Sequence, residues 1–157
     1  MSNLDATDRE IVMELQRNAR RSNKDLAEAV GVAPSTMLTR VRSLEERGVL
    51  RGYHADVDPA ALGRPVRATV SVRLQPKSRD VVERFVQHVW SLEETESISL
   101  VTGAFDVIID LSVADVSMLG SRVLNEIATF DAVVDEQTTL VLERRRKVVL
   151  APFSREA

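Results

Sequence analysis

Short hydroxyl side chains and guanidinium groups gather on one side of an expected helix near the N-terminus. The helix begins at Pro34 and runs to about residue 47. Its outward-facing side chains are Ser35, Thr36, Thr39 and Ser43, flanked by Arg40, Arg42 and Arg47. Hydroxyl groups on a helix can reach base edges or phosphates in the DNA major groove, and arginine can donate to guanine or to the backbone. The pattern therefore predicts a DNA-reading helix on which Thr36, Thr39, Arg40 and Ser43 supply the base preference, although an ordinary solvated helix surface would look the same.

Residues 22–48 supply the two helices needed to hold this surface. Ser22 is a suitable N-cap, and Asp25 three residues later completes a capping box. Gly31 can end the first helix in a left-handed conformation, and Pro34 suits the first turn of the second. Apolar positions recur with helical spacing: Leu26, Ala27 and Val30 in the first helix, and Met37, Leu38, Val41 and Leu44 in the second. The sequence therefore predicts a helix-turn-helix pair.

An additional helix is expected over residues 4–18, where Asp5 or Thr7 can act as the N-cap. Its core-facing positions are Ile11, Val12 and Leu15. With the pair it makes a bundle of about 50 residues. The bases expected to contact phosphates are Arg20, Arg21, Lys24 and Arg51. Residues 17–51 carry eight bases and four acids, so this stretch is positive although the whole chain has a net charge of −3.

The overall composition excludes several classes of protein. The 157 residues are 44% hydrophobic and 29% charged, as in an ordinary globular protein. No apolar run approaches the roughly 20 residues of a membrane span, and the acidic N-terminus does not resemble a signal peptide. The chain has no cysteine and two isolated histidines, so we expect no metal site and no cofactor. These features favour a cytoplasmic protein without a membrane partner.

An extended segment is expected after the helical pattern ends. Residues 49–57 can form a wing against the DNA backbone or a strand that leads out of the domain, and Gly52 allows a bend. Residues 58–63 suit a hinge or a short helical turn. We therefore assign residues 1–52 to a helix-turn-helix domain and residues 53–63 to a linker.

The second half of the chain alternates between strand and helix periodicity. Strands are expected over residues 66–74, 97–102, 105–113 and 133–142, with helices that begin after Ser78 and at Asp115. Gly103 and Ala104 suit a two-residue hairpin turn. The resulting βαββαβ order predicts a ferredoxin-like α+β fold with both helices on one face of an antiparallel sheet. We assign residues 64–144 to this domain and residues 145–157 to a C-terminal tail.

The other face of this sheet would have no cover of helices. Ile108, Val101 and either Leu140 or Val141 would then be exposed apolar residues. Packing against a second copy of the same face would bury them. We therefore expect at least a homodimer.

The chain resembles the leucine-responsive/AsnC family of transcription regulators, also called feast/famine regulators. The resemblance spans roughly residues 3–145 and rests on many short matches in the right order. These matches are Leu4-Asp5 with Asp8-Arg9, Asp25-Leu26-Ala27, Val30-Gly31-Val32, Arg40-Val41 with Leu44-Glu45, Gly48-Val49-Leu50, Gly52-Tyr53, Asp58-Pro59 with Leu62-Gly63, Val101-Thr102-Gly103 with Phe105-Asp106, and Thr138 before Leu140-Val141-Leu142. One departure is Ala33, where the family often has a helix-capping serine, so that either the helix loses some stability or Ser35 takes this role.

The resemblance implies a winged helix-turn-helix domain that binds double-stranded DNA, followed by a RAM/ACT-like domain that binds a small effector, usually an amino acid. The effector lies at contacts between dimers, and dimers assemble further, for example into octamers. Carried over by residue, the effector-binding positions are Gly103, Ala104, Phe105, Asp106 and Thr138. Gly103 would let a ligand approach backbone N–H groups, and Asp106 would bind an ammonium group.

Each of these residues also has an explanation without a ligand. Gly103 is required by the turn in either case, Phe105 suits the core, and Thr138 is an ordinary strand residue. Asp106 shares a sheet face with Arg67 and Arg73 and can be a structural ion-pair partner. The basic run at residues 144–147 suits a solvated surface, with contact to DNA or to a partner as the alternative.

The resulting prediction is an effector-responsive, sequence-specific transcriptional regulator without enzymatic activity. Two alternatives remain open. One is an architectural DNA-binding protein that has no effector. The other is an enzyme similar to the related sirohaem decarboxylases, for which neither His54 nor His88 lies in a suitable constellation.

Overall fold

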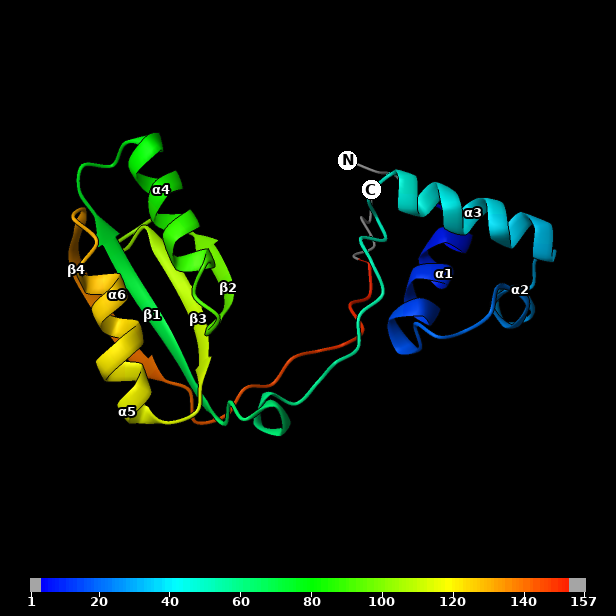
Figure 1. Ribbon diagram of the computed structural model, residues 1–157. Helices are drawn as coiled ribbons and strands as arrows, with labels where there is room; N and C mark the ends of the chain where they lie inside the picture. The colour runs from blue at the N-terminus through cyan, green and yellow to red at the C-terminus, as the bar shows by residue number, and fades with distance from the viewer. Residues whose placement is uncertain (1–3, 153–157) are drawn as a thin grey trace. The chain divides into compact units, whose positions relative to one another are not determined.

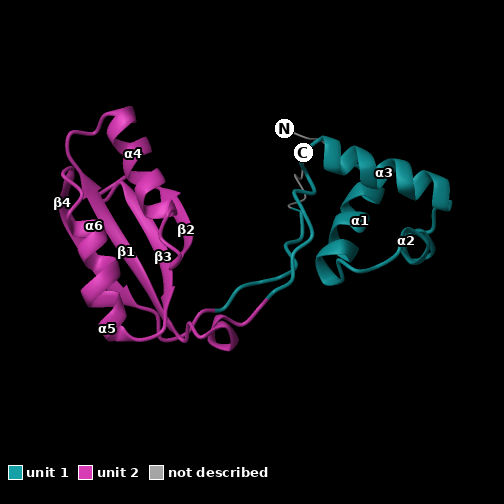
Figure 2. Cartoon of the chain, viewed as in Figure 1, with its two compact units in different colours: residues 1–56, 145–157 teal, residues 57–144 magenta. Residues whose placement is uncertain are grey.

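The computed structural model describes residues 4–152, which form two compact units. Within that range, one unit contains residues 4–56 together with residues 145–152, and the other contains residues 57–144 (Figure 2). The described part of the expected tail therefore groups with the helical unit. Residues 1–3 of the expected first domain and residues 153–157 of the expected tail lie outside the described residues.

Three helices form the first unit: α1 (Ala6–Arg17), α2 (Asn23–Val30) and α3 (Pro34–Glu46) (Figure 1). Asp5, not Thr7, caps α1 by accepting a hydrogen bond from the Asp8 N–H at 2.7 Å. Ser22 caps α2, and its hydroxyl in turn donates to Asp25 at 2.8 Å. One of the two bonds of the expected capping box is therefore present, from the Asp25 N–H to the Ser22 hydroxyl, whereas the Asp25 carboxylate binds the hydroxyl of Ser22 and not its N–H.

The turn between α2 and α3 also follows the expected chemistry at its first residue. Gly31 ends α2 with φ of 75°, in the left-handed region that glycine adopts without strain. Ala33 occupies the N-cap of α3 and makes no side-chain cap bond. Ser35 does not replace it, because Ser35 already lies inside the helix. Helix α3 therefore begins without a capping side chain.

The core of the helical unit is made by apolar side chains from all three helices. Its buried members are Ile11, Leu15, Leu26, Ala27, Met37, Val41 and Leu44. Leu38 was expected in this stripe but is 47% exposed, because its position on α3 lies at the edge of the packed face. The core therefore holds α3 by a narrow stripe and leaves the rest of its surface accessible.

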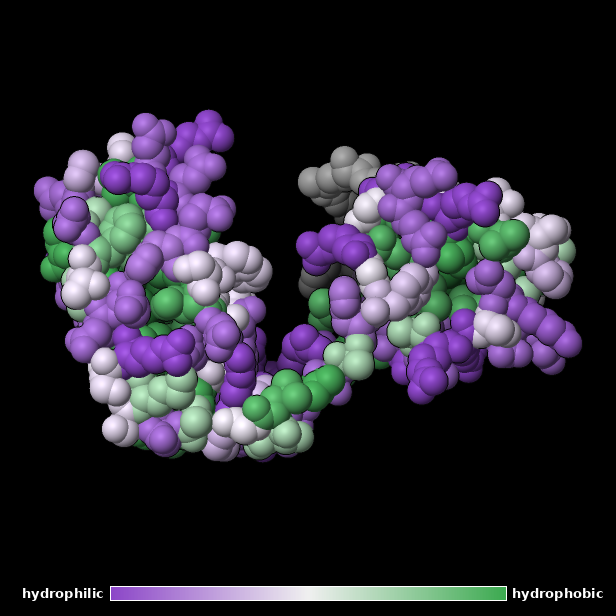
Figure 3. All heavy atoms as spheres, in the orientation of Figure 1, coloured by the Kyte–Doolittle hydropathy of each residue, from purple (hydrophilic) through white to green (hydrophobic). Residues whose placement is uncertain are grey.

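The segment after α3 contains no strand in residues 49–58, so the expected extended chain is present without a β-wing. A short 3₁₀ helix, η1 (Pro59–Leu62), follows and is capped by Asp58. Leu62 is 65% exposed, and Figure 3 shows the apolar surface over this turn. None of the described helices is long and apolar enough to cross a bilayer.

The second unit is a four-stranded sheet with helices. Its elements are β1 (Val66–Leu74), α4 (Arg79–Trp90), β2 (Thr95–Leu100), β3 (Val107–Val113), α5 (Val116–Met118), the π-helical turn η2 (Leu119–Leu124), α6 (Asn125–Ala128) and β4 (Val133–Leu140). The strand order is β2-β3-β1-β4 and all neighbouring pairs are antiparallel. The predicted ferredoxin-like α+β fold is confirmed.

Helices α4 and α5–α6 pack on the same face of this sheet (Figure 1). The buried residues of β1 and β3 alternate along the strands, as the period of two requires. Phe85 of α4 and Ile127 of α6 are fully buried against them. Hydrophobic burial on this face therefore fixes which side chains of each strand point to the opposite face.

The structure corrects one detail of the expected sheet and decides between two alternatives in another. The connection between β2 and β3 is a loop at residues 101–106, closed by a hydrogen bond from Val101 N–H to the Asp106 carbonyl at 2.9 Å. It is therefore longer than the expected two-residue turn. Leu140 pairs with Ala68 and so lies on the helix-covered face, whereas Ile108 lies on the opposite face beside Ser71 and Ser99. We call the opposite face the open face.

Candidate nucleic-acid interface and ligand loop

The outward surface of α3 carries the predicted hydroxyl side chains. Ser35, Thr36 and Thr39 are exposed, and Ser43 is half-buried. The Thr39 hydroxyl donates to the Ser35 carbonyl at 3.1 Å, which leaves its oxygen able to accept from a base or a water. These side chains form a short polar strip along the helix.

Arg40 does not extend this strip. Its guanidinium donates to Asp5 Oδ2 at 2.6 Å and to Asp8 Oδ1 at 2.8 Å, both at the start of α1. Asp8 is only 5% exposed, and Arg47 binds its second oxygen at 3.2 Å. Arg40 therefore joins α3 to α1, and the geometry does not favour its predicted role as a base-reading residue.

The pKa values of the exposed part of this cluster reflect the contacts. The Asp8 N–H, and then the Arg40 guanidinium, hold the pKa of Asp5 below its usual value. The hydrogen bonds to Asp5 and Asp8 raise the pKa of Arg40. Asp5 and Arg40 therefore remain charged at neutral pH, and the contact between them is an ion pair that links α3 to the start of α1.

Arg42 was named beside the hydroxyl side chains in the sequence analysis but was not singled out for contact with bases. Arg42 is exposed and comes seven residues after Ser35 and three residues after Thr39. With this helical spacing, Arg42 lies on the same side of α3 as the polar strip. It also lines a cavity of about 440 Å³ together with Leu38 and Tyr53. Counting helical positions from Ser35 would have identified it without a structure.

The four bases expected to contact phosphates differ in their exposure and in their ion pairs. Arg20, Lys24 and Arg51 are exposed. Arg21 is half-buried and bridges to Glu14 at 2.6 Å, and Glu14 also pairs with Arg17. The positive charge that is best placed for phosphate contact is therefore on Arg20, Lys24 and Arg51.

The 101–106 loop presents a glycine and an anchored carboxylate. Gly103 has φ of 127°, a backbone conformation that L side chains rarely adopt, and it has open space where a side chain would lie. Ala104 is exposed and Phe105 is half-buried. Asp106 donates its backbone N–H to the Val72 carbonyl, which fixes the end of the loop to β1.

The Asp106 carboxylate already has two partners. Oδ2 accepts a hydrogen bond from the Leu74 N–H at 2.9 Å, and Oδ1 lies 2.7 Å from the Lys77 ammonium. Burial opposes ionisation, but Lys77 and the Leu74 N–H outweigh it and hold the pKa of Asp106 below its usual value. Its side chain is 13% exposed, so the ionised carboxylate is fixed in place and reached from one side.

Thr138, the fifth predicted effector position, does not lie beside the Asp106 carboxylate. It pairs with Val70 on β1 and lies on the helix-covered face, with β1 between it and the strand that leads from Asp106. Among the described residues, no hydrogen bond joins Thr138 to the 101–106 loop. The chain therefore assembles four of the five predicted effector positions and leaves the fifth on another strand.

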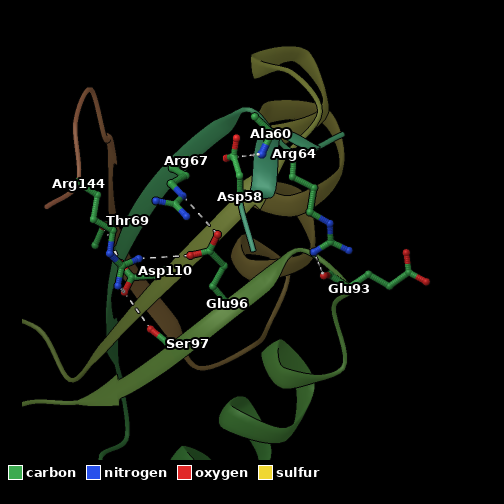
Figure 4. A network of polar contacts seen from close by, with 10 residues as sticks. All are labelled: Asp58, Ala60, Arg64, Arg67, Thr69, Glu93, Glu96, Ser97, Asp110 and Arg144. Carbon is green, nitrogen blue, oxygen red and sulfur yellow. Dashed lines mark hydrogen bonds and ion pairs between the residues drawn. The ribbon is translucent and has the colours of Figure 1, made fainter. Parts of the chain in front are cut away.

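A second polar cluster covers one end of the open face (Figure 4). Asp110 accepts hydrogen bonds from Thr69 and Ser97, each at 2.9 Å. Arg144, just beyond β4, reaches both Glu96 at 3.3 Å and Asp110 at 3.6 Å. Two further ion pairs join Arg67 to Glu96 and Arg73 to Asp135, and the charge of Arg73 also helps to lower the pKa of Asp106. The open face is therefore largely polar, with Ile108 and Val141 as apolar exceptions.

Comparison with known proteins agrees with both units. A model of the AsnC-type helix-turn-helix domain matches residues 4–45, and a model of the Lrp/AsnC ligand binding domain matches residues 67–148. The chain belongs to the Lrp/AsnC family. It is therefore a DNA-binding transcriptional regulator with a domain for a small-molecule effector, and not an enzyme.

Individual Lrp/AsnC proteins are similar over nearly the whole chain. The transcriptional regulator AldR of Mycolicibacterium smegmatis is 37% identical over 143 residues, which are 91% of this chain and 84% of AldR. The leucine-responsive regulatory protein of Haemophilus influenzae is 37% identical over 89% of this chain and 84% of its own length. A regulator from Neisseria meningitidis, solved as a complex with L-methionine, superposes with a TM-score of 0.85 at 29% identity and covers 96% of both chains.

Proposed function

We propose that this regulator reads DNA with the polar strip of α3 and senses an amino acid at the 101–106 loop. The observation that carries the sensing role is the Asp106 carboxylate, which is ionised, held by the Leu74 N–H and already paired with an ammonium group at 2.7 Å. An amino acid offers the same ammonium group. The L-methionine complex of the Neisseria relative supports the choice of ligand class.

In the DNA complex, Ser35, Thr36, Thr39 and Arg42 would face the bases of the major groove. Arg20, Lys24 and Arg51 would neutralise phosphates, which makes the affinity depend on salt. Two such units in a homodimer would contact successive major grooves of a roughly palindromic site, about one helical turn apart. The protein would carry out this role in the cytoplasm.

The effector would use two parts of the loop. Its ammonium would take the place of Lys77 on Asp106 Oδ1, and its carboxylate would accept from backbone N–H groups near Gly103, where no side chain blocks the approach. Lys77 can leave at little cost because its side chain is 59% exposed to solvent. Thr138 would then contact the ligand only if another copy of the chain supplies it.

Binding would change operator affinity by favouring one assembly over another. We propose that dimers form through the open face and associate further into larger assemblies such as an octamer. An effector that binds one assembly more tightly shifts the population toward it, and DNA affinity changes by the same coupling free energy.

The decisive experiment is a thermal-shift screen with the twenty amino acids on the wild type and on Asp106→Asn. Asparagine keeps an oxygen for the Leu74 N–H but loses the charge, so an amino acid that raises the wild-type melting temperature should have no effect on this variant. The matched control is Asp135→Asn. It removes an exposed carboxylate of β4 that pairs with Arg73 of β1, and it should respond to amino acids as the wild type does.

The effector-free architectural role is the second candidate, and the full pairing of Asp106 within the chain favours it. In that case no amino acid shifts the melting temperature of the wild type, and DNA affinity is the same with and without each one. An amino acid that stabilises the wild type and Asp106→Asn equally would instead place the effector away from this loop.

A further inference from the structure

The positive charge of the helical unit comes from its C-terminal segment. Residues 4–56 contain nine acidic and nine basic side chains and are therefore neutral. Residues 145–152 add three bases and no acid, and residues 57–144 contain fourteen acids against eight bases. A neutral three-helix body is a poor polyanion binder in general terms, because phosphate affinity depends on the local excess of Lys and Arg.

Two contacts fasten this segment to the helical unit. The Gln16 side-chain amide donates to the Leu150 carbonyl at 3.1 Å, and its oxygen accepts from the Leu150 N–H at 2.8 Å. One side chain thereby satisfies both backbone groups of one residue, as a neighbouring strand would. Arg146 lies 3.7 Å from Asp56, where the segment runs beside the chain that leaves α3 (Figures 1 and 2).

The place of attachment is itself basic. Gln16 belongs to the last turn of α1, and Arg17, Arg20 and Arg21 follow it within five residues. Leu150 comes three residues after Lys147, the last base of the segment. The two hydrogen bonds between Gln16 and Leu150 therefore hold the three bases of residues 145–147 near the basic end of α1.

We propose that residues 145–150 form a phosphate-binding arm of the DNA-binding unit, held in place by Gln16. The arm goes beyond the contacts of α3 and of the three bases assigned above, and its partner is the sugar–phosphate backbone of duplex DNA. Its contribution is independent of base sequence, raises the overall affinity and steepens the dependence on salt.

The test measures binding of the full-length protein to a duplex of arbitrary sequence, about three helical turns long, over a range of salt concentrations. The variant Arg146→Gln/Lys147→Gln should bind more weakly, and its slope of log K against log salt should be shallower by roughly 1 to 2. The matched control is Arg79→Gln/Arg84→Gln, which removes the same charge from α4 and should keep the wild-type slope. Equal slopes for the two double variants would overturn the arm.

A third variant tests the attachment at constant charge. Gln16→Ala keeps all bases but removes both hydrogen bonds to Leu150, so we expect weaker binding and faster hydrogen exchange of the Leu150 amide. Gln87→Ala, on the exposed side of α4, is its control. If Gln16→Ala binds as the control does, docking by Gln16 has no part in DNA binding. A wild type that binds no duplex would refute the DNA-reading role itself, which separates that failure from failure of the arm.

Discussion

Two carboxylates of the sheet unit show how burial and partners decide the state of a single side chain. Asp106 is ionised because Lys77 and the Leu74 N–H compensate for its burial. Glu136 on β4 lies on the helix-covered face beside Val72, and burial raises its pKa with no opposing contact. Its Oε2 atom is buried and has no hydrogen-bond partner. The two residues therefore respond to pH in opposite directions.

Replacement of Glu136 by glutamine should stabilise the protein at neutral pH. The folded-state pKa of Glu136 lies above the usual value of 4.5, so both states are protonated well below that pH and the wild type has no penalty there. As the pH rises through the unfolded pKa, the unfolded state ionises first and the wild type loses stability until the folded pKa is passed. We expect Glu136→Gln to raise the melting temperature by roughly 3 °C at pH 7 and hardly at pH 4.

Thermal denaturation at a series of pH values checks this expectation. Glu126→Gln, an exposed change on α6, serves as the control and should leave the curve of melting temperature against pH unchanged. A stabilisation of Glu136→Gln that is the same at pH 4 and pH 7 would show that ionisation of Glu136 is not its cause.

The arginines of helix α3 have two different roles. Arg40 and Arg47 face α1 and share the nearly buried Asp8, whereas Arg42 faces outward with Ser35. The two faces follow from the helical repeat, since positions two apart point in very different directions. Arg40 and Arg47 therefore orient the helix, and Arg42 is available to the DNA.

Alanine variants of these two arginines should separate the roles. Arg42→Ala should weaken operator binding roughly tenfold and leave the melting temperature unchanged, because it removes one DNA contact and no packing. Arg40→Ala should lower the melting temperature by roughly 5 °C, since Asp8 loses a charge partner, with operator affinity unchanged at temperatures where the variant is folded. Fluorescence anisotropy and circular dichroism measure the two quantities. The reverse assignment of effects would return Arg40 to the DNA interface.

At the scale of the whole molecule, the two units carry different kinds of surface. The sheet unit is acidic, and its open face carries Ile108 between Ser71 and Ser99, with ion pairs elsewhere on the same face. The helical unit is neutral until the C-terminal segment joins it. Self-association through a polar face of this kind depends on a small apolar centre, because exposed ion pairs contribute little.

Introduction of a charge at Ile108 should therefore reduce the oligomeric state. We expect Ile108→Glu to elute with the mass of a monomer, or at least of a smaller oligomer than the wild type, in size-exclusion chromatography with light scattering. Val116→Glu, at a 55% exposed position of α5 outside the open face, should keep the wild-type mass. An unchanged mass for Ile108→Glu would show that the open face is not the contact between copies.

The sequence by itself determined the order of the main elements, the sheet topology, the cap of α2 and the family. These depend on local signals: the periods of 2 and 3.6, the spacing from Ser22 to Asp25, and short motifs along the chain. The hydroxyl strip of α3 and the group of Gly103 and Asp106 also follow from neighbours in sequence. What these residues contact in the functional state remains a prediction.

Only the tertiary structure decided which partners the charged side chains take. Arg40 was assigned to DNA from its position on a helix, but Asp5 and Asp8 lie more than thirty residues away along the chain. Lys77 on Asp106, and Gln16 on Leu150, are pairings of the same kind. The physical reason is that a long flexible side chain can reach several partners, and the fold alone determines which partner lies within hydrogen-bond distance.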